Sequence, residues 1–229
     1  MLTRIKTCCI ASQDEAQMAL RAGAHALGLV SAMPSGPGVI DEDAIAKIAA
    51  SVPPPVATFL LTSEQSPGAI AEQHRRCRTT AIQFVDRIDP ADYPALREVL
   101  PTTKLVQVVH VTGPASVDKA ESVAPHVDAL LLDSGGPDEG PDEGPDADAA
   151  RQLGGTGRTH DWSLSQTIVE RVETPVFLAG GLDPTNVAEA VRTVRPFGVD
   201  VCTGVRTDGR LDVHKLIGFI QAVHSVASS

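Results

Sequence analysis

The sequence predicts a single (β/α)8 barrel domain over residues 1–229. Short apolar runs alternate along the chain with stretches of helical periodicity, and the alternation repeats eight times. Parallel strands need crossover helices between them, and eight such strands close a sheet into a barrel. A chain of 229 residues with 42% hydrophobic residues is long enough to bury one compact barrel core. A doubly wound open sheet is the alternative fold.

The expected strands are apolar runs, as is usual for strands that are buried on both faces. They lie at residues 5–10, 26–30, 56–61, 81–84, 104–111, 129–132, 176–179 and 199–202. The helices expected after them lie at residues 14–22, 42–51, 67–76, 91–100, 116–123, 162–170, 185–193 and 213–226. Ser12 before the first helix and Gly23 after it are typical boundary residues, which supports the placement of that helix.

Residues 135–150 break the alternation with an acidic repeat of Gly, Pro, Asp and Glu. This proline and glycine content is incompatible with helix or strand, so we expect a loop insertion after the sixth strand. Its composition favours an expanded loop that adds only solubility. The alternative is a lid, because the loop leaves the barrel face where the sixth strand ends.

Charge and composition restrict the partners. The chain has 19 basic and 29 acidic residues, and a net charge of -10 argues against nucleic acid as a partner. No apolar run approaches the roughly 18 residues that cross a bilayer, and the start of the chain leads into a strand, so we expect a cytoplasmic protein without membrane contact. The seven histidines show no ligand spacing, and neither a metal nor an organic cofactor is expected.

Two residues at strand ends are candidates for acid and base chemistry. Asp133 follows three leucines and so ends a buried strand on a carboxylate, while Cys8 lies near the end of the first strand. Lys6 shares a strand face with Cys8, because side chains two apart point the same way, and its charge favours a thiolate. The four cysteines form no CxxC pair, so all are expected to be free thiols, with Cys9 packing outward against the helices.

An ordered set of motifs resembles phosphoribosylanthranilate isomerases along the whole chain, most strongly from Asp133 onward. Such a set is far more specific than one glycine-rich loop. The motifs are Lys6-Thr7-Cys8-Cys9-Ile10, Ala22-Gly23-Ala24-His25-Ala26-Leu27-Gly28, Leu131-Leu132-Asp133, Gly154-Gly155-Thr156-Gly157 with Asp161-Trp162, Leu178-Ala179-Gly180-Gly181-Leu182 with Asn186-Val187, and Gly198-Val199-Asp200-Val201-Cys202-Thr203-Gly204-Val205.

The resemblance implies an Amadori rearrangement of a phosphoribosyl aryl amine, without a cofactor, by a monomer or homodimer. In the family's pattern, Asp133 is the general acid that opens the ribose ring and Cys8 is the general base that removes the C2 proton. Phosphate then binds at the last two strand ends, where glycine lets backbone amides approach an anion. The implied binding residues are Lys6, Gly155, Thr156, Gly180, Gly181, Thr203, Gly204 and Arg206.

The chain departs from the family where the amine substituent binds. Residues 34–38 read Pro-Ser-Gly-Pro-Gly, whereas the family has a Ser-Pro-Arg segment whose arginine faces the anthranilate. Arg206, Arg87 or His110 could replace that cation. Two alternatives therefore stay open: a relative that isomerises a different phosphoribosyl amine, and a non-catalytic barrel that binds phosphosugars. A metal-dependent aldolase or epimerase is less favoured.

Overall fold

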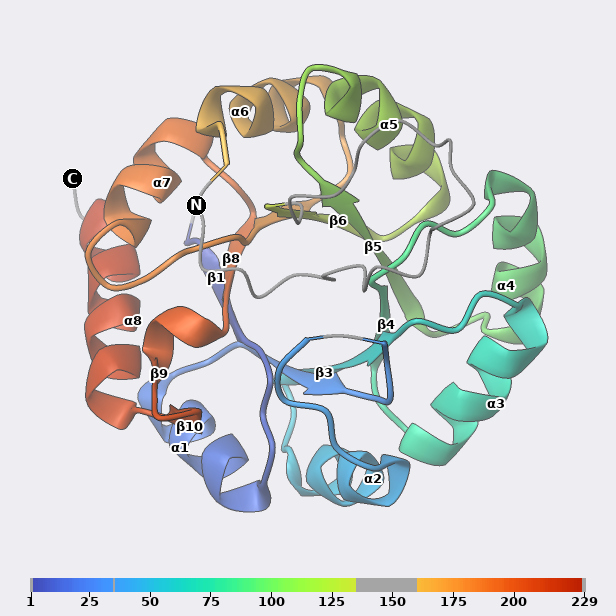
Figure 1. The fold of residues 1–229 in the computed structure, drawn as a ribbon, viewed down its shortest axis with the longest axis horizontal. Helices are drawn as coiled ribbons and strands as arrows, with labels where there is room; N and C mark the ends of the chain where they lie inside the picture. The colour runs from blue at the N-terminus through green and yellow to red at the C-terminus, as the bar shows by residue number, and fades with distance from the viewer. Residues whose placement is uncertain (1, 35, 135–159, 228–229) are drawn as a thin grey trace.

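The computed structural model describes residues 2–34, 36–134 and 160–227, and it is a closed barrel of eight parallel strands inside a ring of helices (Figure 1). This architecture confirms the predicted (β/α)8 fold. The strands are β1 Arg4–Thr7, β2 Ala26–Val30, β3 Ala57–Thr62, β4 Ala81–Phe84, β5 Lys104–His110, β6 Ala129–Asp133, β7 Val176–Leu178 and β8 Gly198–Val201. They pair in chain order, and β8 closes the barrel against β1.

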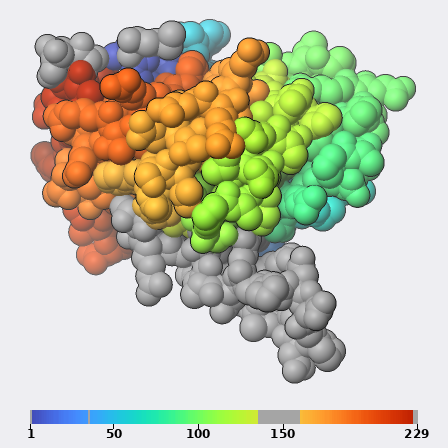
Figure 2. All heavy atoms as spheres, turned by 90° about the horizontal axis from the view of Figure 1, so that it is seen from above, coloured from blue at the N-terminus to red at the C-terminus, as the bar shows by residue number. Residues whose placement is uncertain are grey.

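The helices follow their strands and lie side by side on the outside, as Figure 2 shows for α5, α6 and α7. The helices are α1 Gln13–Ala22, α2 Glu42–Ser51, α3 Pro67–Cys77, α4 Tyr93–Val99, α5 Ala115–Val123, α6 Trp162–Arg171, α7 Val187–Val194 and α8 Val213–Ala227. Ser12 caps α1 as predicted, since its Oγ accepts a hydrogen bond from Glu15 N at 3.2 Å. Gly23 ends the helix at φ 101°, a left-handed conformation that favours glycine.

Two apolar regions hold the barrel together. The larger one lies between the strands and the helices and includes Leu29, Ile82 and Leu132, which are fully or nearly fully buried. The smaller one fills the inside of the barrel, where Phe59 and Phe177 meet edge to face with ring centroids 6.1 Å apart. The barrel is therefore packed along its axis, and polar side chains at the strand ends stand above an apolar floor.

The main differences from the predicted elements lie at strand and helix ends. β1 ends at Thr7 rather than at residue 10, because Cys9 adopts φ 61° and leaves the extended conformation. The segment before α4 begins as a short 3-10 helix, Pro90–Asp92. A small antiparallel hairpin of β9 Arg206–Thr207 and β10 Arg210–Leu211 follows β8 and was not predicted. The acidic insertion at residues 135–150 lies outside the described residues.

None of the helices in the described part of the chain is long and apolar enough to cross a membrane.

Candidate active site

A pocket opens at the carboxyl ends of the strands, inside the mouth of the barrel. Its lining includes both predicted catalytic residues, Cys8 after β1 and Asp133 at the end of β6. Residues from the other strand ends complete the lining, among them His110 on β5 and Asp200 on β8. Parallel strands bring side chains that are far apart in sequence to this one edge, which is why barrel chemistry sits there.

Cys8 lies over a buried ion pair. Lys6 Nζ donates to Asp200 Oδ2 at 2.8 Å, and both side chains are almost completely buried. Burial lowers the pKa of Lys6, but the neighbouring Asp200 and Cys8 outweigh it, so the pKa of the ammonium is raised and the group stays charged. Burial raises the pKa of the Cys8 thiol to about 11, while the charge of Lys6 opposes this rise. The thiol therefore keeps its proton at neutral pH when the pocket holds no ligand.

Gly28 on β2 leaves room for this arrangement. A Cβ on Gly28 would lie 2.6 Å from Cys8 Sγ and 3.0 Å from Lys6 Nζ. Glycine is required here because any side chain would displace the thiol or the ammonium from the barrel interior.

Asp133 has the properties of a proton donor near neutral pH. Its Oδ1 accepts a hydrogen bond from Ser134 N at 2.8 Å. Burial raises the pKa of Asp133 to about 6, with a further rise from the Asp200 carboxylate and an opposing effect from His110. A carboxyl group with this pKa exchanges a proton at physiological pH, which a general acid requires.

The two loops after β7 and β8 form a glycine-rich side of the pocket. Gly180, Gly181 and Thr203, which the sequence predicts to bind phosphate, all line it. Gly180 has φ 81°, and a Cβ there would lie 2.7 Å from Ser134 N. Gly204 is not among the lining residues; a Cβ at Gly204 would lie 2.0 Å from Leu182 O, so this glycine lets the two loops pack together.

Two of the predicted binding residues, Gly155 and Thr156, lie outside the described residues. Lys6 is not a lining residue either; it lies fully buried and touches the pocket only through its partners Cys8 and Asp200.

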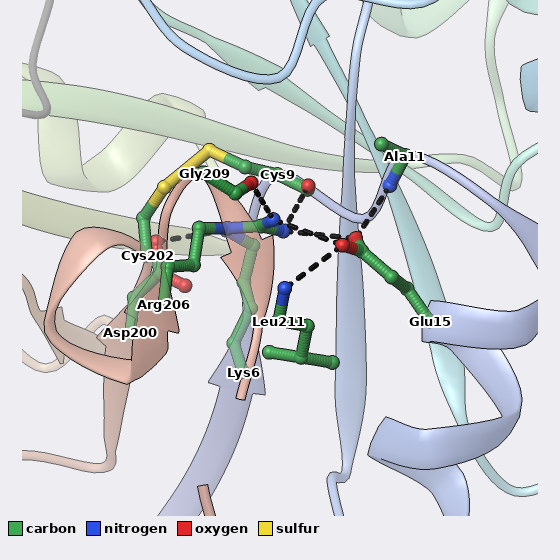
Figure 3. Close-up of a disulfide and its surroundings, with 9 residues drawn as sticks. All are labelled: Lys6, Cys9, Ala11, Glu15, Asp200, Cys202, Arg206, Gly209 and Leu211. Atoms are coloured by element: carbon green, nitrogen blue, oxygen red, sulfur yellow. Dashed lines mark hydrogen bonds and ion pairs between the residues drawn. A yellow bond between two sulfur atoms is a disulfide. The ribbon is translucent and has the colours of Figure 1, made fainter. Parts of the chain in front are cut away.

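The prediction that all four cysteines are free thiols is wrong for two of them. Cys9 and Cys202 form a disulfide with Cα atoms 6.0 Å apart, whereas Cys8 and Cys77 are free (Figure 3). Cys9 also does not face the helices as expected, because its positive φ turns its side chain toward Cys202 at the rim of the pocket. The bridge ties the end of β1, next to Cys8, to the residue that precedes Thr203.

Arg206 does not lie where a substrate-binding arginine was predicted. It is absent from the pocket lining, and both of its Nη atoms donate to the Glu15 carboxylate at 3.0 Å (Figure 3). Its guanidinium also donates to the carbonyl oxygens of Cys9 and Gly209. Glu15 in turn accepts hydrogen bonds from the backbone of Ala11 and Leu211. Arg206 is therefore a structural residue that anchors the β9–β10 hairpin to α1.

Asp200 lines the pocket but was not predicted as a site residue from the sequence. A carboxylate between Val199 and Val201, inside a buried strand, was a signal for a paired interior charge. Its partner could not be identified, because Lys6 lies 194 residues away in sequence.

Comparisons with known proteins agree with this geometry. The family model of N-(5'-phosphoribosyl)anthranilate (PRA) isomerase matches residues 5–222. The N-(5'-phosphoribosyl)anthranilate isomerase of Methanocella arvoryzae is 33% identical over 223 residues, which cover 97% of this chain and 98% of the relative. The phosphoribosyl anthranilate isomerase of Thermus thermophilus has the same fold, with a TM-score of 0.80, 24% identity and coverage of 98% of this chain and 100% of that one.

A further phosphoribosyl anthranilate isomerase structure contains reduced 1-(o-carboxyphenylamino)-1-deoxyribulose 5-phosphate. It has a TM-score of 0.76 and 24% identity, and the match covers 97% of this chain and 99% of that one. Since the family model spans nearly the whole chain, this protein belongs to the N-(5'-phosphoribosyl)anthranilate isomerase family.

Proposed function

We propose that the protein isomerises N-(5'-phosphoribosyl)anthranilate to 1-(2-carboxyphenylamino)-1-deoxyribulose 5-phosphate, the ketol-isomerase step of tryptophan biosynthesis. One observation carries the proposal: Asp133, with a pKa of about 6, and the thiol of Cys8 face the same pocket of a family member. The reaction needs one acid and one base, and these two groups supply them. As an amino-acid biosynthetic enzyme, the protein would work in the cytoplasm.

Ring opening is the first step. Asp133 donates its proton to the furanose ring oxygen, the bond from C1 to that oxygen breaks, and the nitrogen lone pair forms a C1=N iminium. Asp133 is suited to this transfer because burial keeps its carboxyl protonated to a higher pH than usual. The step leaves Asp133 as a carboxylate and the substrate as an open-chain cation.

Proton abstraction is the second step. The Cys8 thiolate removes the C2 proton, and the electrons of that C–H bond form the C1=C2 bond of an enolamine while neutralising the iminium. The enolamine then tautomerises to the ketone, in which C1 gains a proton and the C2 hydroxyl loses its proton as the C2=O bond forms. The pKa of the thiol is about 11 even with the lowering by Lys6, so the thiolate needs a further positive charge to form. The iminium cation of the substrate provides it, since positive charge near a thiol lowers its pKa.

The phosphate group would bind between the loops after β7 and β8. Gly180, Gly181 and Thr203 line the pocket there, and their backbone amides and hydroxyl can donate to phosphate oxygens without a metal. This location anchors the sugar beside Cys8 and Asp133, because β7 and β8 lie between β6 and β1 in the barrel.

A related activity on a different phosphoribosyl amine is the second candidate. It is favoured by one observation: neither arginine nor lysine occurs among the described residues that line the pocket. An aryl amine without a carboxylate would not need such a cation.

A fluorescence-monitored assay with freshly generated phosphoribosylanthranilate tests the proposal. We expect rapid turnover by the wild-type protein and a loss of turnover in Cys8→Ala and Asp133→Asn. Binding of the reduced product analogue to each variant shows whether the pocket is intact. A folded wild-type protein that binds this analogue but does not turn over the substrate would rule out the isomerase activity. Turnover of a carboxylate-free phosphoribosyl amine in place of the anthranilate substrate would support the second candidate.

A further inference from the structure

The side of the pocket away from the phosphate loops is mostly aliphatic. Val30, Leu61, Val85 and Val108 line it from the ends of β2 to β5, and Met33 joins them from the loop after β2. Flat apolar walls of this kind suit an aromatic ring, which gains most from burial against aliphatic side chains. An aryl amine substituent would therefore lie on this side.

His110 is the basic side chain on that aliphatic side. It is the last residue of β5 and lines the pocket, and no other Arg, Lys or His occurs among the described lining residues. Its Nδ1 is buried and has no hydrogen-bond partner within the described structure. Buried polar atoms are normally paired, so an unpartnered ring nitrogen at a pocket wall is free to bind a polar group of a ligand.

The position of His110 fits a group next to the reacting carbons. His110 pairs in register with Asp133 on β6, and neighbouring strands lie about 4.8 Å apart. His110 also opposes the rise in the pKa of Asp133, as expected for neighbouring side chains. In the barrel, β5 lies opposite β1 (Figure 1), and His110 at the end of β5 and Cys8 after β1 both line the pocket. A substrate whose C1 and C2 lie between Asp133 and Cys8 would extend its amine substituent toward His110.

Among the described residues, the other candidate cations are either paired with an acidic residue or absent from the pocket lining. Arg206 is held by Glu15, and Lys6 is held by Asp200 below the pocket floor. Arg87, in the segment after β4, is exposed and does not line the pocket. Gln83, whose Oε1 is also unpartnered, is deeper than His110, because it pairs with Val106, four residues before His110 on β5.

We propose that His110 binds the carboxylate of the anthranilate ring and thereby selects the amine substituent, in place of the arginine that the chain lacks. The proposal rests on the proposed function and adds to it the residue that recognises the aryl group. The imidazole donates an N–H to the carboxylate, so the contact exists only for substrates that carry this group. Substrates without it would lose nothing when His110 is removed.

The test measures binding of two ligands rather than turnover. The first is reduced 1-(o-carboxyphenylamino)-1-deoxyribulose 5-phosphate, and the second is its phenylamino counterpart without the carboxylate. We expect His110→Ala to weaken the first ligand about 10- to 100-fold, as for loss of a charged hydrogen bond, and the second less than about 2-fold. Arg87→Ala is the matched control, and we expect it to change neither affinity. His110→Gln, which retains an N–H donor, should recover part of the lost affinity.

The outcomes separate this proposal from the isomerase activity. Equal weakening of both ligands in His110→Ala would assign His110 to positioning Asp133 or to general packing, and unchanged affinity for both would exclude it from binding. Either result overturns the proposal while leaving wild-type turnover as evidence for the isomerase. Thermal melting of each variant shows that the fold is retained. If the wild-type protein lacks turnover but binds the carboxylate ligand through His110, the proposed function fails and the recognition site stands.

Discussion

The two halves of the barrel mouth differ in the charged groups that they hold. The half with the proposed phosphate site, here the phosphate half, is formed by the ends of β6, β7, β8 and β1. Its charged groups have protein partners, since Lys6 pairs with Asp200 and Asp133 accepts from Ser134, and only Asp200 Oδ1 among the buried atoms of these carboxylate and ammonium groups lacks a partner within the described residues. The half with the proposed site for the amine substituent, here the aglycone half, is formed by the ends of β2 to β5. Its lining is mostly aliphatic, and Gln83 Oε1 and His110 Nδ1 have no partner in the described structure.

This difference assigns catalysis to the phosphate half of the mouth and substrate specificity to the aglycone half. Paired charges are fixed before a ligand arrives, as catalysis by electrostatic preorganisation requires. The unpaired atoms of the aglycone half are available to a ligand, so they can distinguish one amine from another. Changes in the phosphate half should therefore affect turnover of every substrate, whereas changes in the aglycone half should affect some ligands only.

The largest expected effect comes from removing the base. Cys8→Ala should lower kcat by about 10³- to 10⁴-fold, because no other group in the described pocket replaces the thiolate. Affinity for the reduced product analogue should change little, since the phosphate loops are untouched. Cys77→Ala is the matched control, because Cys77 is the other free cysteine and is buried at the end of α3. Turnover in Cys8→Ala within 10-fold of the control would exclude the thiol as the base.

Asp133→Asn tests the acid and its pH dependence. The active form has one proton on the two groups, with Asp133 protonated and Cys8 ionised, and their pKa values are about 6 and about 11. The rate should therefore be highest between these values and fall as the pH drops below about 6, where both groups are protonated. We expect about a 10²- to 10³-fold loss of kcat/KM in Asp133→Asn, and the break near pH 6 should disappear, so that its residual activity rises with pH as the Cys8 thiol ionises. The substrate phosphate titrates equally for both proteins, so the comparison isolates Asp133.

The same variant should be more stable than the wild-type protein at pH 8. Burial raises the pKa of Asp133, so folding favours its protonated form and is opposed by its ionised form above pH 6. Asparagine is uncharged at every pH, like the protonated form of Asp133, so its burial carries no such penalty. A higher melting temperature at pH 8, with the difference shrinking toward pH 4, is the expected result. A lower melting temperature at pH 8 would contradict the burial argument.

Several of these features could be predicted from the sequence, and others could not, for physical reasons. Hydrophobic periodicity located all eight strand-helix units, because each strand is buried on both faces and each helix on one. Cys8 and Asp133 were found because strand ends meet in a parallel barrel. The Cys9–Cys202 bridge and the Glu15–Arg206 pair join residues 193 and 191 positions apart, and spacing carries no signal at that range. Arg206 was therefore predicted to bind the substrate, whereas in the structure it forms an ion pair with Glu15 on α1.

Arg206→Met should destabilise the fold rather than the reaction. The side chains of Arg206 and Glu15 are only 8% and 10% exposed, so removing one partner leaves a buried charge and should cost about 3–5 kcal/mol of unfolding free energy. Arg76→Met, which breaks exposed pairs with Glu42 and Glu72, is the control and should have a much smaller effect. Denaturant unfolding measures both. In the variants that remain folded, affinity for the product analogue should be unchanged.

The Glu15–Arg206 pair also has a predictable pH dependence. Burial alone would raise the pKa of Glu15, but hydrogen bonds from Arg206, Leu211 and Ala11 hold it below its ordinary value. The ionised Glu15 carboxylate therefore stabilises the fold fully above about pH 4.3, its unfolded-state pKa, and this stabilisation is lost as the pH falls through the lowered pKa of the folded state. The difference in stability between wild type and Arg206→Met should shrink below that pH. A difference that stays constant down to pH 3 would show that packing, not charge, carries the effect.

The smallest expected effect belongs to the disulfide, and it tests whether the phosphate half is braced as a unit. The bridge closes a loop of 193 residues and holds the residue before Thr203 against the end of β1, so Cys202→Ser should cost about 2–4 kcal/mol of stability. Cys9→Ser and the double variant should lose no more than the single change, because either substitution already breaks the bond. The affinity for the reduced product analogue should fall a few-fold, because the loop that carries Thr203 is no longer held to β1. The affinity for the counterpart without the carboxylate should fall by the same factor, so the ratio of the two affinities stays constant. A change in that ratio would mean that the two halves are coupled through the bridge and that reaction and specificity are not separable in this barrel.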